Sequence, residues 1–383
     1  MKILITGANG FVGKNLTSTL QAIKEGKDKT RPLGSELEIF KYDVETEERL
    51  LDEYCAECDC VVHLAGVNRP TDPREFMAGN YGFTVELLET LKKHKNKASV
   101  ILSSSVQAEL DNEYGKSKRA GEELLREYGR KTGAKVYIYR YPNLFGKWCR
   151  PNYNSVVATF CHNIAHGLDI TVSDREKELT FAYIDDVVSA LLETLAGTTE
   201  TDGNGYAYVK KTYKVKLGRI ADLIRSFKEN RNTLSVPDMS DEFTAKLYAT
   251  YLSYLPKGGC AYALQPHCDA RGSFTEILRT RNAGQFSVNV TKPGVTKGEH
   301  WHHTKNEKFL VVSGKGVIRL RNIFSEDIEE YCVSGEKPEV VDIPAGYTHN
   351  IENLGETDMI TFMWCSECFD PEKPDTYYLK VKE

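Results

Sequence analysis

The first residues constrain the fold of this chain more than any other segment. Lys2–Thr6 (KILIT) is a short apolar strand. Gly7 and Gly10 follow it, and Gly13 lies in the amphipathic stretch that starts at Phe11. Glycines allow a tight turn and a close approach of the backbone, and the start of a helix offers free N–H groups to a phosphate. This order of elements predicts a nucleotide-binding strand–turn–helix unit at the N-terminus.

Strand-like and helix-like segments alternate up to about residue 230. Apolar runs at Cys60–Ala65, Val100–Leu102 and Val136–Tyr139 read as strands, and Met77–Leu91 has apolar residues at helical spacing. Such alternation produces parallel strands joined by crossover helices on both faces of a sheet. We expect an α/β fold of the Rossmann type, with a doubly wound parallel sheet.

The pattern changes in the last third of the chain. Short alternating runs such as Gln285–Thr291 and Met359–Trp364 are separated by glycine-containing turns. Evenly spaced short strands of this kind predict an all-β barrel or jelly roll. We therefore expect a nucleotide-binding domain at 1–245, a linker at 246–259 and an all-β domain at 260–383.

Composition excludes several classes of protein. The 50 Lys+Arg and 55 Asp+Glu give a net charge of −5 and a pI of about 6.1, whereas nucleic-acid-binding domains usually have a pI above about 9. The sequence contains no run of about 18 apolar residues that would predict a membrane span, and its start lacks the features of a secretory signal. We expect a cytoplasmic protein whose ten cysteines are reduced.

A tyrosine and a lysine form a candidate proton-transfer pair. Tyr114 and Lys118 make a YxxxK motif, so both side chains share one face of a helix. A nearby ammonium favours the phenolate and lowers the pKa of tyrosine from about 10, which suits proton exchange at neutral pH. One of the serines before the motif should hydrogen-bond the substrate oxygen. This region resembles the extended short-chain dehydrogenase/reductases, and the position of Val106 in that resemblance favours Ser103, with Ser104 as an alternative.

These motifs together resemble the extended short-chain dehydrogenase/reductases over most of residues 1–230. The glycine spacing is GxxGxxG, which is typical of that family. The resemblance implies that Ser103, Tyr114 and Lys118 are catalytic and that the chain binds a dinucleotide. The implied cofactor-binding residues are Gly7, Asn9, Gly10, Phe11, Val12 and Gly13 in the first turn, Lys41, Asp43 and Val44 after the second strand, Leu64, Ala65 and Gly66 after the third, and Tyr114, Lys118 and Arg140.

The choice of cofactor depends on the second strand. An acidic residue at its end would bind the ribose 2′-hydroxyl of NAD, whereas a basic residue favours the 2′-phosphate of NADP. The expected strand Leu37–Tyr42 carries Lys41. Asp43 and Val44 resemble the segment that contacts the adenine in the family, which leaves no acid at the ribose position. We expect NADP(H).

Further residues resemble the substrate site of nucleotide-sugar enzymes in this family. Asn143 follows a predicted strand, and Arg175 precedes Phe181–Val187, where relatives often place an arginine on the diphosphate. A guanidinium suits that role because it binds phosphate through two hydrogen bonds. Dehydratase relatives carry Asp-Glu directly after the catalytic Ser/Thr, but Ser104 and Ser105 stand there. Sugar 4,6-dehydration is therefore disfavoured.

A histidine cluster is the strongest signal in the last third of the chain. His300 and His302 alternate on a predicted strand, so both imidazoles face one side. Glu307 can come from a neighbouring strand, and a Pro-x-Gly turn precedes His349. Three imidazoles and a carboxylate make a plausible site for a first-row divalent metal, with Zn²⁺ the default for a non-redox role.

Both histidine motifs resemble those of the cupin superfamily. The segment Arg271–Glu276 also resembles the opening of the sugar 3,5-epimerase cupins. In those relatives a metal-free pocket uses a histidine base at a position resembling His300, so a base at His300 stays open beside a ligand role. Either arrangement serves removal of a proton α to a ketone.

A reductase fused to a cupin resembles the bifunctional capsule-biosynthesis enzymes. That resemblance implies a UDP-linked 4-keto-6-deoxy amino sugar as substrate, on the route to UDP-N-acetyl-L-fucosamine. It also implies that the cupin epimerises C3 and that the reductase then uses NADPH on the C4 ketone. We expect no nucleic-acid or membrane partner, and a homodimer. A UDP-hexose 4-epimerase with an accessory cupin and a non-enzymatic NADP-sensing protein remain as alternatives.

Overall fold

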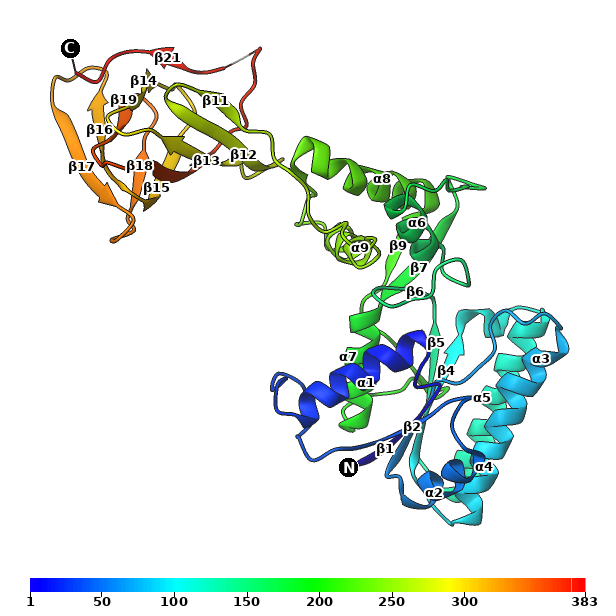
Figure 1. The fold of residues 1–383 in the computed structure, drawn as a ribbon. Coiled ribbons are helices and arrows are strands. Elements are labelled where there is room, and N and C mark those ends of the chain that lie inside the picture. Colours follow the sequence, from blue (N-terminus) through cyan, green and yellow to red (C-terminus); the bar gives the residue numbers. More distant parts are fainter. Residues whose placement is uncertain (373, 383) are drawn as a thin grey trace. The chain divides into compact units, whose positions relative to one another are not determined.

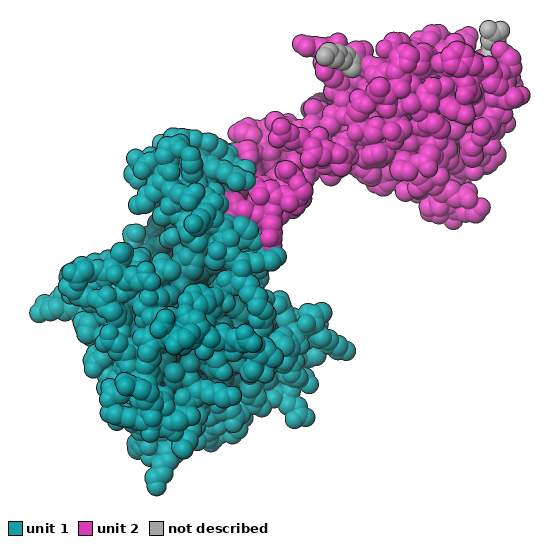
Figure 2. Space-filling model, turned by 180° about the vertical axis from the view of Figure 1, so that it is seen from behind, with its two compact units in different colours: residues 1–225, 246–256 teal, residues 226–245, 257–383 magenta. Residues whose placement is uncertain are grey.

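The computed structural model describes residues 1–372 and 374–382. The chain divides into two compact units, the first comprising 1–225 with 246–256 and the second 226–245 with 257–383 (Figure 2). The predicted linker is partly helical. Helix α9 spans Glu242–Leu252, and it forms because Leu247 and Tyr251 give it a buried apolar face.

A parallel sheet forms the centre of the first unit (Figure 1). Its strand order is β2-β1-β3-β4-β5-β8, and each neighbouring pair is parallel. The order reverses direction at β1, as in doubly wound folds that bind nucleotides at the carboxyl ends of their strands. The strands are β1 (Lys2–Thr6), β2 (Glu38–Tyr42), β3 (Cys60–His63), β4 (Ser99–Ser105), β5 (Val136–Tyr141) and β8 (Tyr206–Ala207).

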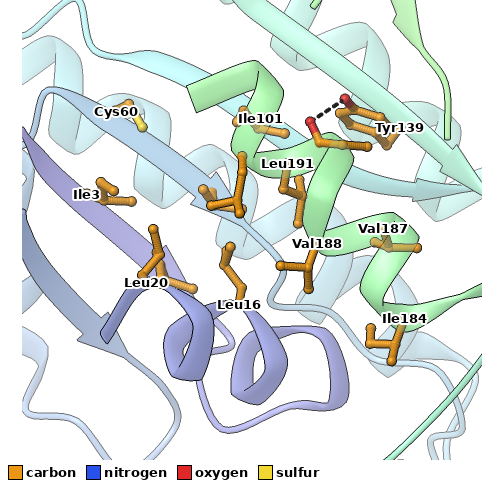
Figure 3. Packing of buried hydrophobic residues seen from close by; sticks show 14 of the residues in the cluster. Ile3, Leu16, Leu20, Cys60, Ile101, Tyr139, Ile184, Val187, Val188 and Leu191 are labelled. Carbon is orange, nitrogen blue, oxygen red and sulfur yellow. Dashed lines mark hydrogen bonds between the residues drawn. The ribbon is translucent and has the colours of Figure 1, made fainter. Parts of the chain in front are cut away.

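Helices cover both faces of this sheet. On one face, α1 (Phe11–Lys24) and α7 (Ile184–Leu195) bury side chains such as Leu16, Leu20 and Leu191 against Ile3 and Ile101 (Figure 3). On the other face, residues of α2 (Glu48–Glu57), α4 (Phe83–Lys93) and α5 (Glu113–Thr132) pack on the alternate residues of the same strands. The predicted Rossmann-type architecture is confirmed.

The helix that carries the YxxxK motif has well-defined ends. At its start the Asn112 side chain accepts a hydrogen bond from the Gly115 amide at 2.7 Å. At its end Gly133 adopts a left-handed conformation with φ of +77°. A side-chain cap and a terminal glycine of this kind fix where a helix begins and stops. They therefore set the position of Tyr114 in the first turn of α5.

The predicted helix Met77–Leu91 contains an irregular first part. Residues Arg74–Phe76 form α3, and Met77–Gly82 form the π-helical segment η1, which continues into α4. Asn80 lies in η1 and is buried. Single π-helical turns are frequent at functional sites, and this one turns Asn80 towards the loop after β3.

Smaller elements complete the first unit. A short sheet contains β6 (Asn143–Phe145), β7 (Glu178–Tyr183) and β9 (Tyr213–Lys216). The remaining elements are the 3-10 helix η2 (Val106–Glu109), α6 (Val156–Ala165) and α8 (Leu217–Thr233), whose last residues belong to the second unit. In the described chain, no helix is both long and apolar enough to cross a membrane.

Two β-sheets make up most of the second unit. One has the order β10-β12-β13-β20-β15-β18 with β11 against β12, and the other has the order β17-β16-β19-β14-β21. Apolar residues of β15, β16 and β19 such as Phe309, Ile318 and Ile351 form the core, and the predicted all-β barrel is confirmed. The strands are β10 (Ser235–Val236), β11 (His267–Asp269), β12 (Gly272–Thr280), β13 (Gln285–Thr291), β14 (Thr296–Trp301), β15 (Glu307–Ser313), β16 (Lys315–Asn322), β17 (Ile328–Ser334), β18 (Val340–Ile343), β19 (Tyr347–Asn353), β20 (Met359–Cys365) and β21 (Tyr377–Tyr378).

Candidate functional site

The glycine turn brings the start of α1 close to the ends of β1 and β3. Gly7 has φ of +70°, and a Cβ at this position would lie 2.7 Å from the backbone nitrogen of Ala65. A Cβ at Gly13 would collide with the carbonyl oxygen of Gly7. Gly10 is the N-cap of α1, and within the described residues no side chain caps that end. The first turn of α1 therefore offers N–H groups to a pyrophosphate.

The end of β2 lies beside the glycine turn. The Asp43 carboxylate accepts hydrogen bonds from the Asn9 amide at 2.7 Å and from the Val44 amide at 2.9 Å. Asp43 thus joins β2 to the turn through its side chain. The Val44 side chain is 96% exposed, which leaves an apolar surface for an adenine ring. Both residues lie beside the glycine turn, and their contact with a cofactor stays a prediction.

A basic cavity of about 500 Å³ lies against α1 next to this turn. Lys14, Lys27 and Lys41 line it together with Glu25, which contacts Lys27 at 2.5 Å. The lysines outnumber the carboxylate, so the cavity carries an excess of positive charge. That charge suits a phosphate on the ribose of a dinucleotide better than a free 2′-hydroxyl.

Helix α5 brings the predicted tyrosine and lysine together at the end of β4. The Lys118 Nζ atom lies 5.9 Å from the centroid of the Tyr114 ring and donates to the carbonyl oxygen of Ser103 at 3.2 Å. The Tyr114 hydroxyl donates to Oδ1 of Asn68 at 3.1 Å. Sequence reasoning missed Asn68, because it lies in an irregular loop after β3 without a motif to mark it.

Ser105, rather than the predicted Ser103, is the serine whose hydroxyl influences the pKa of Tyr114. The Ser105 side chain lies near enough to the Tyr114 hydroxyl to lower its pKa, and it accepts from the Gln107 amide at 3.2 Å. Ser104 faces the other side of the strand and donates to Glu122 at 2.5 Å. Strand alternation places Ser103 and Ser105 on one face, but Ser105 is the last residue of β4. The alternative Ser104 is directed away from the pair.

This correction leaves the argument against dehydration intact. The two residues after Ser105 are Val106 and Gln107, which lie in η2. Neither can act as the carboxyl acid or base of an elimination. The short 3-10 helix also explains how the few residues between the serines and Tyr114 connect β4 to α5.

Serine replacements should separate the two assignments. Replacing Ser105 by alanine should lower kcat for ketone reduction by about 10²-fold, because the substrate oxygen loses a positioned donor. The matched Ser103→Ala variant should stay within about threefold of the wild type, because Lys118 contacts the Ser103 backbone carbonyl. Steady-state oxidation of NADPH measures both variants. Equal losses in the two would contradict the assignment of Ser105.

Burial governs the protonation of the tyrosine and lysine. Burial raises the pKa of Tyr114 above its ordinary value, and the hydrogen bond with Ser105 opposes this shift. Burial also lowers the pKa of Lys118 to about 8, against the opposing charge of Glu122. The sequence argument expected Lys118 to lower the pKa of Tyr114, but burial of the phenol is the largest influence and raises it. Tyr114 is therefore protonated at neutral pH, as a proton donor must be.

The turn after β3 packs against the lysine. A Cβ at Gly66 would lie 2.6 Å from Oδ1 of Asn80 and 3.0 Å from Nζ of Lys118. The Asn80 amide group accepts from the Val67 amide at 2.9 Å and donates to Oγ of Ser117 at 3.0 Å. Asn80 therefore holds the turn containing Leu64, Ala65 and Gly66 against α5, which is a positioning role.

A buried histidine under this turn predicts a pH-dependent stability. The His63 ring lies between Oγ1 of Thr6 at 2.7 Å and Oγ1 of Thr84 at 2.9 Å, and burial lowers its pKa from 6.5 to about 3. Between pH 6.5 and 3 the unfolded chain binds a proton at His63 and the folded chain does not. Stability should therefore fall as pH falls through this range, by up to about 1.4 kcal/mol per pH unit.

Urea unfolding of the wild type and of His63→Gln at several pH values between 4 and 7 would measure this contribution. The variant should lose stability less steeply on acidification than the wild type, because glutamine does not titrate. Parallel slopes for the two proteins would show that His63 is already charged in the folded state.

Arg140 belongs to a structural ion pair rather than to the predicted cofactor site. Its guanidinium donates to both carboxylate oxygens of Glu122, at 2.9 and 2.7 Å, and to Glu109 at 3.0 Å. The Glu122 side chain is fully buried. Arg140 stands opposite Ser104 in the sheet register, so it shares the face that packs on α5. The motif does not predict on which face of the sheet Arg140 lies, because that depends on the strand register.

The two predicted substrate residues lie on the surface of the first unit. Asn143 is exposed in β6 and donates to the carbonyl oxygen of Thr180 at 3.1 Å. Arg175 pairs with Asp222 at 2.6 Å, and about half of its side chain is exposed. Both side chains remain accessible to a ligand. Their contact with substrate stays a prediction.

The second unit brings the four predicted metal ligands together. His300 and His349 stand directly opposite each other on β14 and β19, with ring centroids 4.5 Å apart. His302 follows the end of β14, and its ring lies 5.0 Å from that of His300. Oε2 of Glu307, at the start of β15, lies 3.2 Å from Nε2 of His349 and 3.5 Å from Nε2 of His302.

A bulge in β14 produces this arrangement. The register shifts between Gly298 and His300, and Glu299 has φ of +61°. The bulged Glu299 bonds outside the cluster, to Nδ2 of Asn350 at 2.8 Å and to the Val381 amide at 2.6 Å. An extra residue in one strand re-aims the side chains that follow it, and here the next residue is His300.

The charges of the cluster suit a cation. Burial lowers the pKa of His300 to about 4, so its imidazole is neutral. Burial tends to raise the pKa of Glu307, but its contacts with His302 and His349 outweigh that effect and the pKa is lowered. Burial tends to lower the pKa of His302, but the contacts with Glu307 and with the Asp375 carbonyl raise it, and the pKa is raised overall. A neutral imidazole and an ionised carboxylate are the forms that bind metals; His300 and Glu307 are in these forms, whereas the raised pKa of His302 favours its protonated form.

The geometry of the cluster also fits a metal. One donor atom from each of His300, His302, Glu307 and His349 lies within 4.8 Å of all the others. Among the described residues, Nε2 of His302 and Oε2 of Glu307 are buried atoms that have no hydrogen-bond partner. Buried polar atoms normally have partners, and a divalent ion would satisfy both. Imidazole and carboxylate donors fit Zn²⁺ or a neighbouring first-row metal.

Comparison with known proteins covers both units. Residues 3–208 match the NAD dependent epimerase/dehydratase family, and residues 267–377 match the polysaccharide biosynthesis C-terminal domain. The crystal structure of the capsular polysaccharide assembling protein CapF from Staphylococcus aureus is 52% identical to this chain, with 100% of both chains covered and a TM-score of 0.91. The chain belongs to the CapF family.

Other relatives extend this comparison. The UDP-2-acetamido-2,6-beta-L-arabino-hexul-4-ose reductase of Pseudomonas aeruginosa is 43% identical over 383 residues, which is all of both chains. The spore coat polysaccharide biosynthesis protein SpsL of Bacillus subtilis matches 29% of this chain and 81% of its own length, at 26% identity. Similarity to CapF-type proteins thus includes both units, whereas the match to SpsL covers a smaller part.

Membership of this family confirms some of the predictions made from the sequence. The resemblance to bifunctional capsule-biosynthesis enzymes is confirmed, and so is the prediction of an oxidoreductase enzyme. The domain boundaries, the homodimer and the cytoplasmic location stay predictions. The roles of the individual site residues also stay predictions, apart from the geometric corrections for Ser103 and Arg140.

Proposed function

We propose that this chain is a bifunctional nucleotide-sugar enzyme. Its second unit epimerises C3 of a UDP-2-acetamido-2,6-dideoxy-4-hexulose, and its first unit reduces the C4 ketone to give UDP-2-acetamido-2,6-dideoxy-L-talose. The observation that carries the proposal is the set of Tyr114, Lys118 and Ser105 at one strand end, in a chain 43% identical over its full length to a UDP-hexulose reductase.

The proton chemistry of the reduction follows from the first unit. Ser105 lies near Tyr114 at the end of β4, so a ketone oxygen placed between them would meet two hydroxyl donors. Tyr114 gives its proton to the C4 oxygen as the C4–H bond forms, and the C=O bond becomes a C–OH. Lys118, one helical turn away, stabilises the tyrosinate that remains. A substrate oxygen that enters this position displaces the contact between Tyr114 and Asn68.

NADPH, when bound, supplies the hydride for this step. The glycine turn from Gly7 to Gly13 would hold its pyrophosphate at the start of α1. The cavity lined by Lys14, Lys27 and Lys41 would hold its 2′-phosphate. The N–H groups and the basic cavity lie next to each other along one cofactor path, which supports the choice of NADP over NAD.

The epimerase step belongs to the barrel. A base removes the C3 proton, which is acidic because it lies α to the C4 ketone, and a proton returns to the opposite face. His300, His302, Glu307 and His349 would hold a divalent metal that stabilises the enolate oxygen. The neutral state of His300 also fits the alternative in which this imidazole is the base.

One reaction followed by NMR tests both activities. The full chain is incubated in D₂O with the UDP-4-keto sugar, first alone and then with NADPH. Deuterium at C3 without NADPH supports the epimerase, and a C4 alcohol formed with stoichiometric loss of NADPH supports the reductase. Interconversion of C4 epimers without net oxidation of NADPH would instead indicate a 4-epimerase. The absence of any turnover would exclude an enzymatic role on this substrate.

A further inference from the structure

The last part of the chain passes beside the metal cluster. β21 pairs antiparallel with β14 at His300 and Trp301. Asp375 lies just before β21 and has φ of +40°, a conformation that non-glycine residues seldom adopt. Such a conformation persists where surrounding contacts hold it. At Asp375, both the backbone and the side chain make those contacts.

The backbone of Asp375 fixes the orientation of one metal ligand. Its carbonyl oxygen lies 2.5 Å from Nδ1 of His302. A carbonyl oxygen accepts hydrogen bonds and cannot donate them, so Nδ1 carries the proton. Nε2 is then the atom of His302 with a lone pair for a metal, and it faces Oε2 of Glu307 at 3.5 Å. A neutral imidazole with free rotation would hold neither this tautomer nor this orientation.

The side chain of Asp375 holds that carbonyl in place. One carboxylate oxygen accepts from the His303 amide at 2.9 Å. The other accepts from the Thr304 amide at 3.0 Å, from Oγ1 of Thr304 at 3.0 Å and from the Lys305 amide at 3.2 Å. The carboxylate therefore binds three successive backbone N–H groups in the turn between β14 and β15. This turn connects His302 to Glu307. Asp375 therefore contacts both His302 and the turn that follows it.

We propose that Asp375 is a positioning residue for the metal site of the barrel. It acts through His302, whose tautomer and ring direction it fixes, and through the turn that leads to Glu307. This inference rests on the proposed metal site. Partners of this kind that orient a ligand typically contribute about 10- to 100-fold to metal affinity.

Two substitutions remove the carboxylate without forcing a new backbone conformation. Asp375→Asn keeps one acceptor oxygen and replaces the other by an amide donor, which cannot bind the N–H groups of Thr304 and Lys305. Asp375→Gly removes the side chain at a position where positive φ suits glycine. Asp370→Asn is the matched control, because the Asp370 carboxylate lies in the same segment and accepts from the Glu372 amide at 2.9 Å.

The measurement is metal affinity, by competition of the full chain with a chromogenic chelator for Zn²⁺, together with the visible spectrum of the Co²⁺-loaded protein. We expect about 10-fold weaker binding for Asp375→Asn, about 100-fold for Asp375→Gly and wild-type affinity for Asp370→Asn. The Co²⁺ spectrum should change in the two Asp375 variants because His302 changes direction. Far-UV circular dichroism of the metal-free proteins checks that each variant folds.

Each outcome decides a separate point. Wild-type affinity and an unchanged Co²⁺ spectrum in both Asp375 variants would overturn the positioning role and leave the metal site standing. A wild-type chain that binds neither metal would overturn both proposals. If Asp375→Gly does not fold, Asp375→Asn decides alone, because it preserves the size of the side chain.

Discussion

Tyr114→Phe should lower kcat for reduction of the C4 ketone by about 10²- to 10⁴-fold, the range that a positioned general acid contributes. Phenylalanine keeps the ring and its contact with Phe76 but has no proton to give to the C4 oxygen. Binding of NADPH should stay nearly unchanged, because the glycine turn and the basic cavity do not depend on the phenol. Stopped-flow oxidation of NADPH measures the loss, and fluorescence titration measures cofactor binding.

The matched control for this variant is Tyr54→Phe. Tyr54 stacks on Phe40 with ring centroids 4.6 Å apart, and the substitution keeps that stacking. The control should retain full activity. A Tyr114→Phe enzyme with at least a tenth of the wild-type kcat would show that another group donates the proton, and Asn68 and Ser105 would then be the next residues to test.

Glu307→Gln should prevent metal binding and slow proton exchange at C3. The glutamine has the shape of the glutamate but lacks the negative charge that offsets a divalent ion beside three imidazoles. Metal content measured by mass spectrometry should fall to near zero. Deuterium exchange at C3 should slow by at least about 10²-fold, since a metal contributes several kcal/mol of stabilisation to a developing oxyanion. Reduction of a substrate already epimerised at C3 should continue.

Glu352→Gln is the control for this variant, because Glu352 lies on β19 and pairs with Arg319 at 2.7 Å rather than with the histidines. It should keep both metal and exchange. Wild-type exchange in Glu307→Gln after loss of the metal would show that the ion is structural. In that case His300, neutral through burial, would be the candidate base.

Much of the site follows from local sequence chemistry. The glycines of the GxxGxxG turn after the first strand allow a close approach of the backbone. A Cβ at Gly7 or Gly13 would collide with backbone atoms. A YxxxK pair on a helix must place both side chains on one face. The cluster of His300, His302, Glu307 and His349 could be predicted because such donor residues seldom gather without a function. In each case the spacing of the residues along the chain determines which side chains can lie close together.

Other parts could not be predicted, because they depend on register and on strand ends. Residues 103 to 105 are all serines, so residue type cannot distinguish them. The position at which β4 ends determines which one lies near Tyr114. Arg140 follows the expected strand, but its place opposite Ser104 sends it to Glu122 on α5. Part of the predicted linker became α9 because burial of Leu247 and Tyr251 compensates for weak local signals.

The sequence by itself determined the two-part architecture, the glycine turn, the tyrosine–lysine pair and the four candidate metal ligands. These features depend on periodicity, on glycine sterics and on residue types, which are properties of short segments. Only the tertiary structure shows which serine lies near Tyr114, that Arg140 pairs with Glu122, and that Asn68 contacts Tyr114. It also shows that the carbonyl of Asp375 contacts His302 while its carboxylate binds the following turn. Those contacts join residues far apart in the chain, and their geometry exists only when strands pair and helices pack.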